Sequence, residues 1–293
     1  FVGGSAFVNA RFVVEDLSTQ LLDQSSERVR QYVDDVLAVA IGQGETNQKL
    51  VERGVFELRD HEEMTRLFLA ALAAQPSLSY LSIGLETGEY WHVFRDKDGA
   101  ISVQWLLPNE SGGFDLTDYV PTPDGGLEEK YRDRNTTRTP PYERPDDLAA
   151  KDAGRSVWPE TYNFLGAGGQ FDIPGVTRAT PVRGPDGEVL GVLTADFDLF
   201  ALSRYLERLK IGERGFAFLR ELRHDGSRRV IAHPDAPDRL KLTAPSRDGK
   251  GNEALPAERV EDPRVRGLLS QIPSSLIDYS TDLTSVRFDA DDE

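Results

Sequence analysis

The chain has 293 residues, of which 39% are hydrophobic and 29% are charged. This composition is typical of a folded globular protein, and the length predicts two domains or one large one. Acidic side chains number 50 against 34 basic ones, and the resulting net charge of -16 argues against nucleic acid as a partner.

Cysteine is absent, which excludes disulfides, thiol nucleophiles and zinc–thiolate sites but leaves the redox compartment open. No apolar run approaches the roughly 18 residues of a membrane-spanning helix. The first residue is Phe1, and neither a methionine nor a signal peptide precedes the folded sequence. We therefore expect the chain to be a segment of a longer protein.

The first predicted element is a long amphipathic helix over residues 14–41. Its apolar residues recur at steps of three and four, as they do on one face of a helix. A helix of about 28 residues is about 42 Å long, which exceeds a typical single domain. The apolar stripe can face the core of this chain, or part of it can also contact a second copy, and both interpretations stay open.

A second helix and three strands are predicted next. Asp60 can cap the N-terminus of this helix, Glu63 can reach back toward the cap, and Pro76 ends the helix. The sequence then changes to short β-rich runs that are separated by turn signals. These runs cover residues 79–84, 89–95 and 100–106, and they predict three antiparallel strands in succession.

Residues 107–170 contain most of the turn signals, so we predict a long irregular loop there. Aromatic side chains and arginines are interspersed in this segment, and a plain linker would carry fewer of them. Long loops inside compact domains are more often binding elements than spacers. The segment is therefore expected to contact a ligand.

Regular structure is predicted again after this loop. A hairpin is expected over residues 175–182 and 189–196, followed by a helix over 199–209 with Asp198 as its N-cap. The pattern then starts again, and we place a second domain there. Its predicted elements are a hairpin, a helix and one more strand, over residues 215–222, 229–233, 262–272 and 285–288. The second sheet is expected to be incomplete.

No catalytic constellation is found in the sequence. The histidines are too scattered for a metal pair, and we interpret all four as surface or turn residues. They are His61, His92, His224 and His233. The glycines of residues 166–169 lack the preceding strand and following helix of a phosphate loop. We predict no catalytic residue, no metal site, no cofactor and no enzymatic activity for this segment.

Several stretches carry a resemblance to a known family. They are residues 142–145 (YERP), 157–162 (VWPETY), 175–182 (GVTRATPV) and 187–199 (GEVLGVLTADFDL). In this order they resemble the double Cache domains, which sense small molecules outside bacterial cells. Two later stretches are similar to the opening of the second, membrane-proximal module of that family, namely residues 215–219 (GFAFL) and 231–235 (IAHPD).

The resemblance implies an α+β fold with a long N-terminal helix and two PAS-like Cache modules, each an antiparallel sheet flanked by helices. The helix would cover residues 1–45 and serve signalling or dimerisation. A membrane-distal, ligand-binding module would cover 46–211, and an apparently incomplete membrane-proximal module 212–293. The resemblance also implies an extracytoplasmic, periplasmic position between two transmembrane helices of an inner-membrane protein. A cytoplasmic output module would follow, with a nucleotide cyclase or a histidine kinase favoured.

The resemblance further implies a ligand site. Amino-acid-binding members have an Arg, a following Trp and Tyr, then a Tyr and an Asp, and a last Asp on a strand. Arg144, Tyr162 and Asp196 match this pattern. The other positions hold Asp146, Asp147 and Phe164. The predicted ligand-binding residues are Arg144, Tyr162, Asp196, Tyr142 and Trp158. Because half of the motif is missing, another small polar or anionic solute, such as an organic acid, is favoured over an amino acid.

Each predicted site residue also has a structural alternative. Arg144 can hold the loop through a salt bridge, Tyr162 and Trp158 can be core anchors, and Asp196 can cap the following turn. The predicted function is small-molecule sensing by a membrane receptor, with a homodimer through the N-terminal helix among the expected partners. The alternatives are a secreted hydrolase that uses loop carboxylates and a ligand-free dimerisation module.

Overall fold

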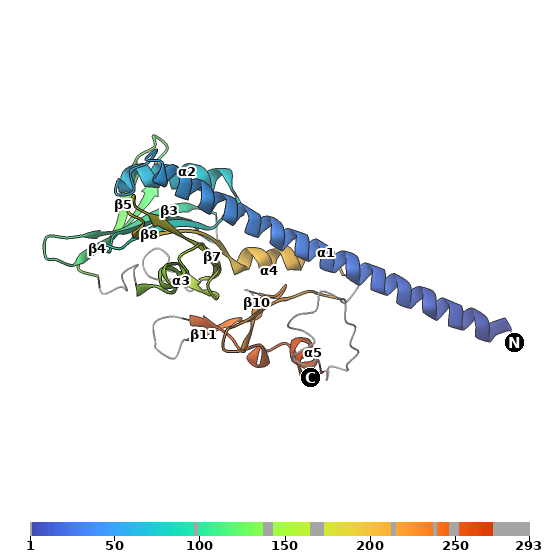
Figure 1. Cartoon of the computed structure of the whole chain (residues 1–293). Helices are drawn as coiled ribbons and strands as arrows, with labels where there is room; N and C mark the ends of the chain where they lie inside the picture. Colours follow the sequence, from blue (N-terminus) through green and yellow to red (C-terminus); the bar gives the residue numbers. More distant parts are fainter. Residues whose placement is uncertain are drawn as a thin grey trace. The chain divides into compact units, whose positions relative to one another are not determined.

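The computed structural model describes residues 2–96, 99–136, 143–164, 173–211, 215–236, 239–245 and 252–271 (Figure 1). The chain forms two compact units. The sheet unit comprises Val36–Leu199 and Arg247–Asn252, and the second unit comprises Phe1–Asp35, Phe200–Ser246 and Glu253–Glu293. Helix α1 spans Val2–Glu52, so its first part belongs to the second unit and its last part to the sheet unit.

The sheet unit is built on one antiparallel sheet of eight strands. The order across the sheet is β5-β4-β3-β2-β1-β8-β7-β6, so β1 to β5 form a meander that β8, β7 and β6 extend beyond β1. The strands are Tyr80–Leu85 (β1), Tyr90–Arg95 (β2), Ile101–Pro108 (β3), Phe114–Pro121 (β4), Leu127–Asp133 (β5), Tyr162–Phe164 (β6), Ile173–Arg183 (β7) and Val189–Asp198 (β8). Gly88 and Gly187 adopt positive φ in two of the hairpin turns, a conformation that favours glycine.

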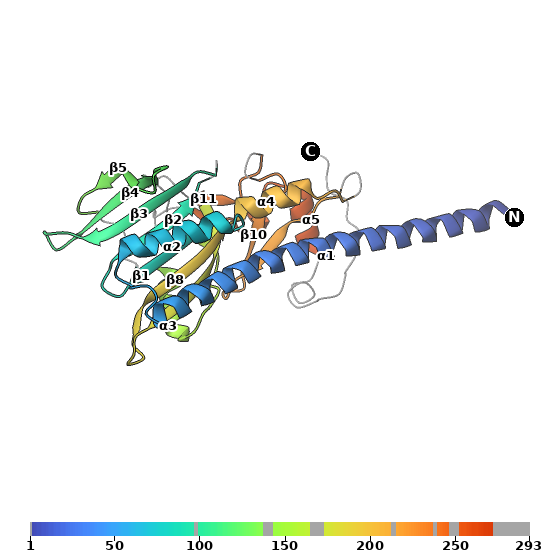
Figure 2. The same cartoon turned by 90° about the horizontal axis from the view of Figure 1, so that it is seen from above.

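One face of the sheet packs against α2 and the end of α1, and Figures 1 and 2 show α2 lying along the sheet. Helix α2 spans His61–Ala74 and buries Met64, Phe68 and Leu72. These side chains share one apolar cluster with Leu81 and other strand residues that point to this face. Apolar burial on this scale is the main force that holds a helix on a sheet.

Helix α2 begins where the sequence predicts. The Asp60 carboxylate accepts a hydrogen bond of 2.9 Å from the backbone N–H of Glu63, which is the N-cap interaction. The carboxylate of Glu63 accepts from the backbone N–H of Glu57, three residues before the cap. The expected return contact of Glu63 with the cap is therefore replaced by a contact with the incoming chain. The helix ends at Ala74, just ahead of Pro76.

Helix α3 spans Pro145–Ala153 and lies against β7 and β8, on the opposite side of the sheet from α2 (Figure 1). Ala150 is fully buried with Ala179 and Val192. Small side chains at this contact let the helix approach the strands closely. Lys151 Nζ lies 2.8 Å from the carboxylate of Glu86 and ties the helix to the turn that follows β1.

The second unit contains shorter elements. They are α4 (Leu199–Arg208), β9 (Leu219–Leu222), β10 (Arg228–Ala232), β11 (Thr243–Pro245), β12 (Asn252–Ala254), the 3-10 helix η3 (Ala257–Arg259) and α5 (Pro263–Gln271). Strands β9 and β10 pair with each other, as do β11 and β12. Val230, Ala257 and Val265 are fully buried in the core of this unit. The Tyr32 ring of α1 stacks on the Tyr205 ring of α4 at 3.7 Å.

The structure confirms the α+β fold with a long first helix and antiparallel sheets. The three successive strands, the hairpin of β7 and β8, the β9–β10 hairpin and the last described helix all form near their predicted positions. The first helix is longer than predicted, because it runs from Val2 to Glu52. No helix of the described residues combines the length and apolar character that a membrane span requires. The strand predicted at 285–288 lies outside the described residues.

The prediction of a long irregular loop over residues 107–170 is wrong. This segment contains β4, β5, α3 and β6. Strand β5 is rich in charged residues and mostly exposed, so it lacks the apolar alternation that identifies a half-buried strand. Paired Gly and Pro signals around these elements mark the turns between them.

Candidate functional site

The sheet face opposite α2 carries a row of buried polar side chains. Thr194, Ser82, His92, Gln104 and Asp118 come from β8, β1, β2, β3 and β4, and each is the direct cross-strand neighbour of the next. Their exposed fractions are all between 2% and 4%. A sheet face that is buried against protein is usually apolar, so a continuous polar row on it needs an explanation.

Hydrogen bonds within this polar row pair some of its buried donors and acceptors. The hydroxyls of Ser82 and Thr194 lie 2.7 Å apart, and Gln104 Nε2 donates to Asp118 at 2.6 Å. The hydroxyl of Tyr90 and Nδ1 of His92 are joined by a bond of 2.8 Å. Each such bond offsets a desolvation cost of roughly 1–3 kcal/mol. The row is thus an ordered polar surface inside the protein.

Asp196 extends this polar surface along β8. It is 4% exposed, and its Oδ2 accepts a hydrogen bond of 2.8 Å from the hydroxyl of Thr194. Its cross-strand neighbours are Thr177 on β7 and Tyr80 on β1. Within the described residues, Asp196 Oδ1 and the Tyr80 hydroxyl have no hydrogen-bond partner. Asp196 therefore lies inside a strand with one oxygen still available, rather than at a turn.

The start of α3 contributes charged groups. Arg144 is the residue before the helix, and Asp146 and Asp147 lie in its first turn with exposed fractions of 1% and 2%. Arg144 Nε lies 3.5 Å from Asp146 Oδ1, and the guanidinium carbon lies 4.7 Å from the centre of the Tyr90 ring. Carboxylates favour a helix N-terminus, but burial to this degree opposes their ionisation.

The charged groups of this cluster influence one another's pKa values. Burial, and then the charge of Asp146, raise the pKa of Asp196 to about 8. Burial, and then Asp146, raise the pKa of Asp147 to about 9. Burial opposes the charge of Arg144, but Tyr90 and Asp146 hold the pKa of its guanidinium well above the ordinary value. Two carboxyl groups of this cluster are thus protonated near neutral pH.

Arg144, Tyr162 and Asp196, which the sequence predicts as ligand contacts, come together in this cluster. The hydroxyl of Tyr162 accepts a hydrogen bond of 3.0 Å from Thr177, the cross-strand neighbour of Asp196. Burial raises the pKa of Tyr162, and Asp146 and Asp196 add to this effect while Arg144 opposes it. The three predicted residues therefore share one electrostatic environment.

Two other predicted contacts do not join them. The Trp158 ring packs with the apolar cluster under α2, where Arg178 lies 5.4 Å from its centre and Phe197 is an aromatic neighbour. Because Phe197 and Asp196 are successive strand residues, they point to opposite faces of the sheet. The structure thus places Trp158 apart from the cluster, and Tyr142 lies outside the described residues.

Sequence reasoning missed the strand residues of this surface. Tyr80 and Ser82 on β1, and Tyr90 and His92 on β2, alternate with apolar residues, and this alternation was the available signal. The interpretation of His92 as a surface or turn residue is wrong, because it is 2% exposed within β2. A sequence shows that such a strand has two faces, but it does not show that the polar one is covered.

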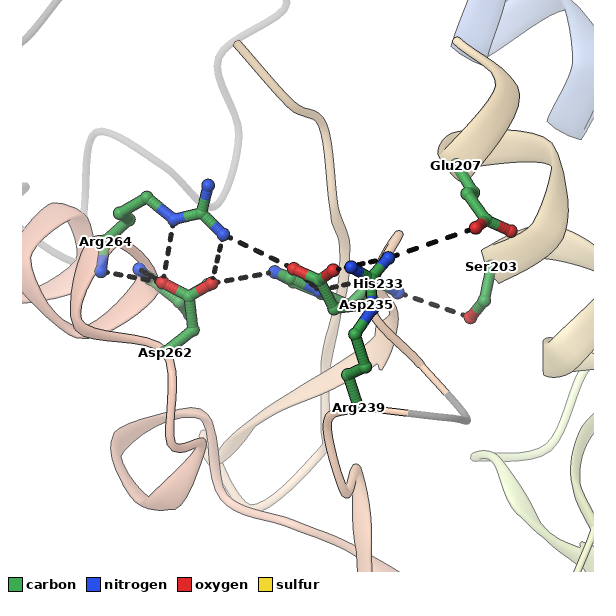
Figure 3. A network of polar contacts seen from close by, with 8 residues as sticks. Ser203, Glu207, His233, Asp235, Arg239, Asp262 and Arg264 are labelled. Atoms are coloured by element: carbon green, nitrogen blue, oxygen red, sulfur yellow. Dashed lines mark hydrogen bonds and ion pairs between the residues drawn. The ribbon is translucent and has the colours of Figure 1, made fainter. Parts of the chain in front are cut away.

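The second unit contains another polar cluster, centred on His233 (Figure 3). His233 is fully buried, so its interpretation as a surface or turn residue is also wrong. Its Nδ1 accepts a hydrogen bond of 3.1 Å from the backbone N–H of Asp235, and its Nε2 lies 3.3 Å from Asp262 Oδ2. Arg264 Nη2 lies 2.6 Å from Asp262 Oδ2 and 3.5 Å from Asp235 Oδ2.

His233, Asp235 and Asp262 could hold a metal ion by distance, but their bonding opposes it. Because Nδ1 of His233 is an acceptor, the ring proton of the neutral form belongs on Nε2, facing Asp262. A metal on Nε2 would require that proton to move to Nδ1 and break the bond to Asp235. Arg264 also neutralises both carboxylates. The cluster therefore ties β10 to the start of α5 as an ion network.

The second unit also contains a cavity of about 420 Å³. It is lined by Val29 and Val33 of α1 and by Ile211, Phe216 and Phe218. The lining is mainly apolar, so this cavity offers less recognition chemistry than the charged cluster of the sheet unit.

In the comparisons with known proteins, only solved structures match this chain. No family model matches the sequence, and no curated protein matches it. The solved structures that match are ligand-binding domains of chemoreceptors and extracellular domains of histidine kinases, among others. The ligand-binding domain of Mlp24 with asparagine is 17% identical with a TM-score of 0.44, over 76% of this chain and 74% of that one.

Two further structures are ligand-binding domains of chemoreceptors. That of the Pseudomonas aeruginosa amino acid chemoreceptor PctB with L-Gln is 19% identical, with a TM-score of 0.41 over 75% of this chain and 69% of that one. That of Campylobacter jejuni Tlp3 with 4-methylisoleucine is 13% identical, with a TM-score of 0.45 over 74% and 68%. At TM-scores below 0.5 these likenesses assign no function by themselves.

Proposed function

We propose that this chain is the extracytoplasmic sensing segment of a bacterial membrane receptor and that a small molecule binds in the sheet unit, in contact with Arg144, Tyr162 and Asp196. The proposal keeps the assignment of residues 1–45 to a signalling helix, 46–211 to the ligand-binding module and 212–293 to the membrane-proximal module. The single observation that carries it is the buried, charged and incompletely bonded cluster on the polar face of the sheet.

The energetics favour a binding role for this cluster over a purely structural one. Buried carboxyl groups with raised pKa values cost stability, and apolar residues of similar size would cost none. Groups of this kind are retained where a ligand or a reaction needs them. Asp196 Oδ1 and the Tyr80 hydroxyl, neighbours across β8 and β1, provide an unused acceptor and an unused hydroxyl for such a ligand.

The alternative of a hydrolase that uses loop carboxylates has less support. In the segment between residues 107 and 136, the acidic side chains of Asp115, Asp124 and Glu129 stabilise local structure. Their pKa values are lowered by hydrogen bonds from Asn109, Thr122 and Arg132, in that order. A general acid needs the opposite shift. Asp147 of the predicted loop does have a raised pKa, but it lies beside Arg144 and Asp146 in the ligand cluster. Asp115, Asp124 and Glu129 therefore act as turn and strand contacts.

The connection from the proposed site to the signalling helix runs along the chain itself. Strand β8 carries Asp196 and continues directly into α4. At the last residue of β8, Asp198 accepts a hydrogen bond of 2.7 Å from Ser79, which precedes β1. Farther along α4, Tyr205 stacks on Tyr32 of α1. A ligand that binds better to one of two conformations of β8 would shift the population of α1 conformations. A cytoplasmic cyclase or kinase module could respond to that shift.

A ligand screen by thermal shift tests the proposal. The purified chain would be heated with amines, amino acids, organic acids, purines and sugars, together with Arg144→Ala, Asp196→Asn and the control Asp186→Asn. Asp186 lies exposed in the β7–β8 turn. We expect a stabilising ligand whose effect is lost in Asp196→Asn, changed in Arg144→Ala and kept in the control. The proposal fails if no class stabilises the chain, or if a ligand stabilises all three variants equally.

A further inference from the structure

The proposed ligand site, formed by the cluster around Arg144 and Asp196, contains more buried carboxyl groups than ion pairs among the described residues. Three carboxyl groups, those of Asp146, Asp147 and Asp196, are each no more than 4% exposed. Within the described residues, Arg144 pairs with Asp146, whereas neither Asp147 nor Asp196 forms an ion pair. Because buried carboxylates need a cation or a proton, the described part of this cluster has fewer cations than carboxyl groups.

Arg144 is poorly placed to hold an acidic ligand. Its Nε faces Asp146 at 3.5 Å, and its guanidinium lies over the ring of Tyr90 at 4.7 Å. The side chain is 14% exposed, so most of its surface is already in contact with protein. A ligand carboxylate would have to compete with Asp146 for the guanidinium and would approach two further acidic groups. The electrostatics therefore disfavour an anion.

An aromatic cluster includes Tyr80, the cross-strand neighbour of Asp196 on β1. Tyr80 stacks on Phe94 with ring centres 5.5 Å apart and contacts Phe164 at 4.7 Å. Tyr162 contacts the Phe164 ring at 5.3 Å. Aromatic faces attract ammonium groups, and a carboxylate beside them supplies the countercharge. These rings and Asp196 together have the chemistry of a cation site.

We infer that the ligand site takes a small organic cation, an amine without a carboxylate group, with its nitrogen at Asp196. This inference rests on the proposed function and adds the ligand class. It keeps the polar option of the sequence-based preference and drops the anionic one, because Arg144 pairs with Asp146.

The amine would bind in exchange for a proton. In the free protein the Asp196 carboxyl is protonated at neutral pH, since burial raises its pKa to about 8. The titratable and charged groups around it are Arg144, Asp146, Tyr80, Tyr90 and Tyr162. Asp147 of α3 and His92 of β2 belong to the same buried polar surface. A bound ammonium stabilises the carboxylate, so the Asp196 proton passes to the buffer while the ammonium keeps its own protons. Affinity therefore rises with pH until about pH 8.

Titration calorimetry on the whole chain tests the inference. The probes are butylamine and tetramethylammonium as cations, succinate and butyrate as anions, and alanine as a zwitterion. Each is measured at about pH 6 and about pH 8, in two buffers with different ionisation enthalpies. We expect the amine to bind, to release close to one proton at about pH 6 and about half a proton at about pH 8, and to bind roughly 50-fold more tightly at the higher pH. The Asp196→Asn variant should weaken binding by about tenfold or more, and Asp186→Asn should leave it unchanged.

The outcomes separate this inference from the proposed function. If succinate or alanine binds more tightly than the amines and the binding depends on Arg144, the cation inference is overturned while the sensing function stands. Amine binding without proton release, or amine binding that Asp196→Asn leaves intact, also overturns the inference. If no probe binds and the broader screen finds no ligand, both fail.

Discussion

Asp196 on β8 and Tyr80 on β1 are direct cross-strand neighbours, and each ends in a buried oxygen without a hydrogen-bond partner among the described residues. Two adjacent buried polar groups are costly unless a partner satisfies them. Their position on the sheet face that also carries Thr194 and Ser82 makes this pair the centre of the proposed binding surface.

Replacing Asp196 should change how stability depends on pH. Its folded-state pKa of about 8 lies above the ordinary value of 3.8, so the unfolded chain loses this proton first as pH rises. The stability contribution of the protonated form is therefore lost progressively between about pH 4 and about pH 8. The Asp196→Asn variant should be more stable than the original chain at the upper end of this window and gain little at the lower end.

Urea unfolding of both chains across this pH range measures the effect. The comparison uses the difference between the two chains, because other carboxylates titrate in the same range. A constant difference at every pH would show that Asp196 is ionised in the folded protein and would contradict the account of its burial.

Alanine substitutions at Gly191 and Gly42 should change the stability of the protein in opposite directions. A Cβ at Gly191 in β8 would collide with the backbone carbonyl of Gly84 in β1, so Gly191→Ala should lower the free energy of unfolding by about 1–3 kcal/mol. A Cβ at Gly42 in α1 meets no atom within 4 Å, so Gly42→Ala should raise it by roughly 0.5–1 kcal/mol. Denaturant midpoints check both, and equal effects would contradict the close pairing of β1 and β8.

The N-cap of α2 should have a measurable effect of its own. Asp60→Ala removes the acceptor for the Glu63 backbone N–H and should cost about 1 kcal/mol of unfolding free energy. Asp60→Ser keeps an acceptor and serves as the matched control. If both variants lose the same stability in urea unfolding, the charge of Asp60 rather than its capping bond is what stabilises the helix.

His233 should titrate below its ordinary range and carry its proton on Nε2. Burial lowers its pKa, and the Asp235 backbone N–H occupies Nδ1. Because the unfolded chain takes up this proton first, stability should fall as pH drops below about 6.5. Nitrogen chemical shifts of the imidazole report both the tautomer and the titration. A proton on Nδ1, or a pKa above the ordinary value, would contradict the ion network drawn from Asp262 and Arg264.

Much of the fold could be predicted because its signals are local. Turn residues such as Gly88 separate the first strands, and the Asp60 cap marks the start of α2. Strand β5 could not be found in this way, since its side chains are mostly exposed and charged. Its pairing with β4 holds it in the sheet, and this tertiary contact cannot be recognised from the local sequence.

The candidate site was predictable only in part. The resemblance pointed to Arg144, Tyr162 and Asp196, which the structure brings together. It could not show that Arg144 faces Asp146, because a charged pair at the start of a helix is equally typical of an exposed surface. Nor could the polar positions of β1 and β2 be recognised, because a polar strand face is ordinarily a solvated one.

A crystal structure of the chain with the tightest ligand from the screen tests the central claim most directly. The account predicts the ligand on the polar sheet face, with a donor nitrogen about 2.8 Å from an Asp196 carboxylate oxygen and the Arg144–Asp146 pair in contact with it or beside it. A ligand bound in the apolar cavity of the second unit, with Asp196 and Arg144 untouched, would contradict the account.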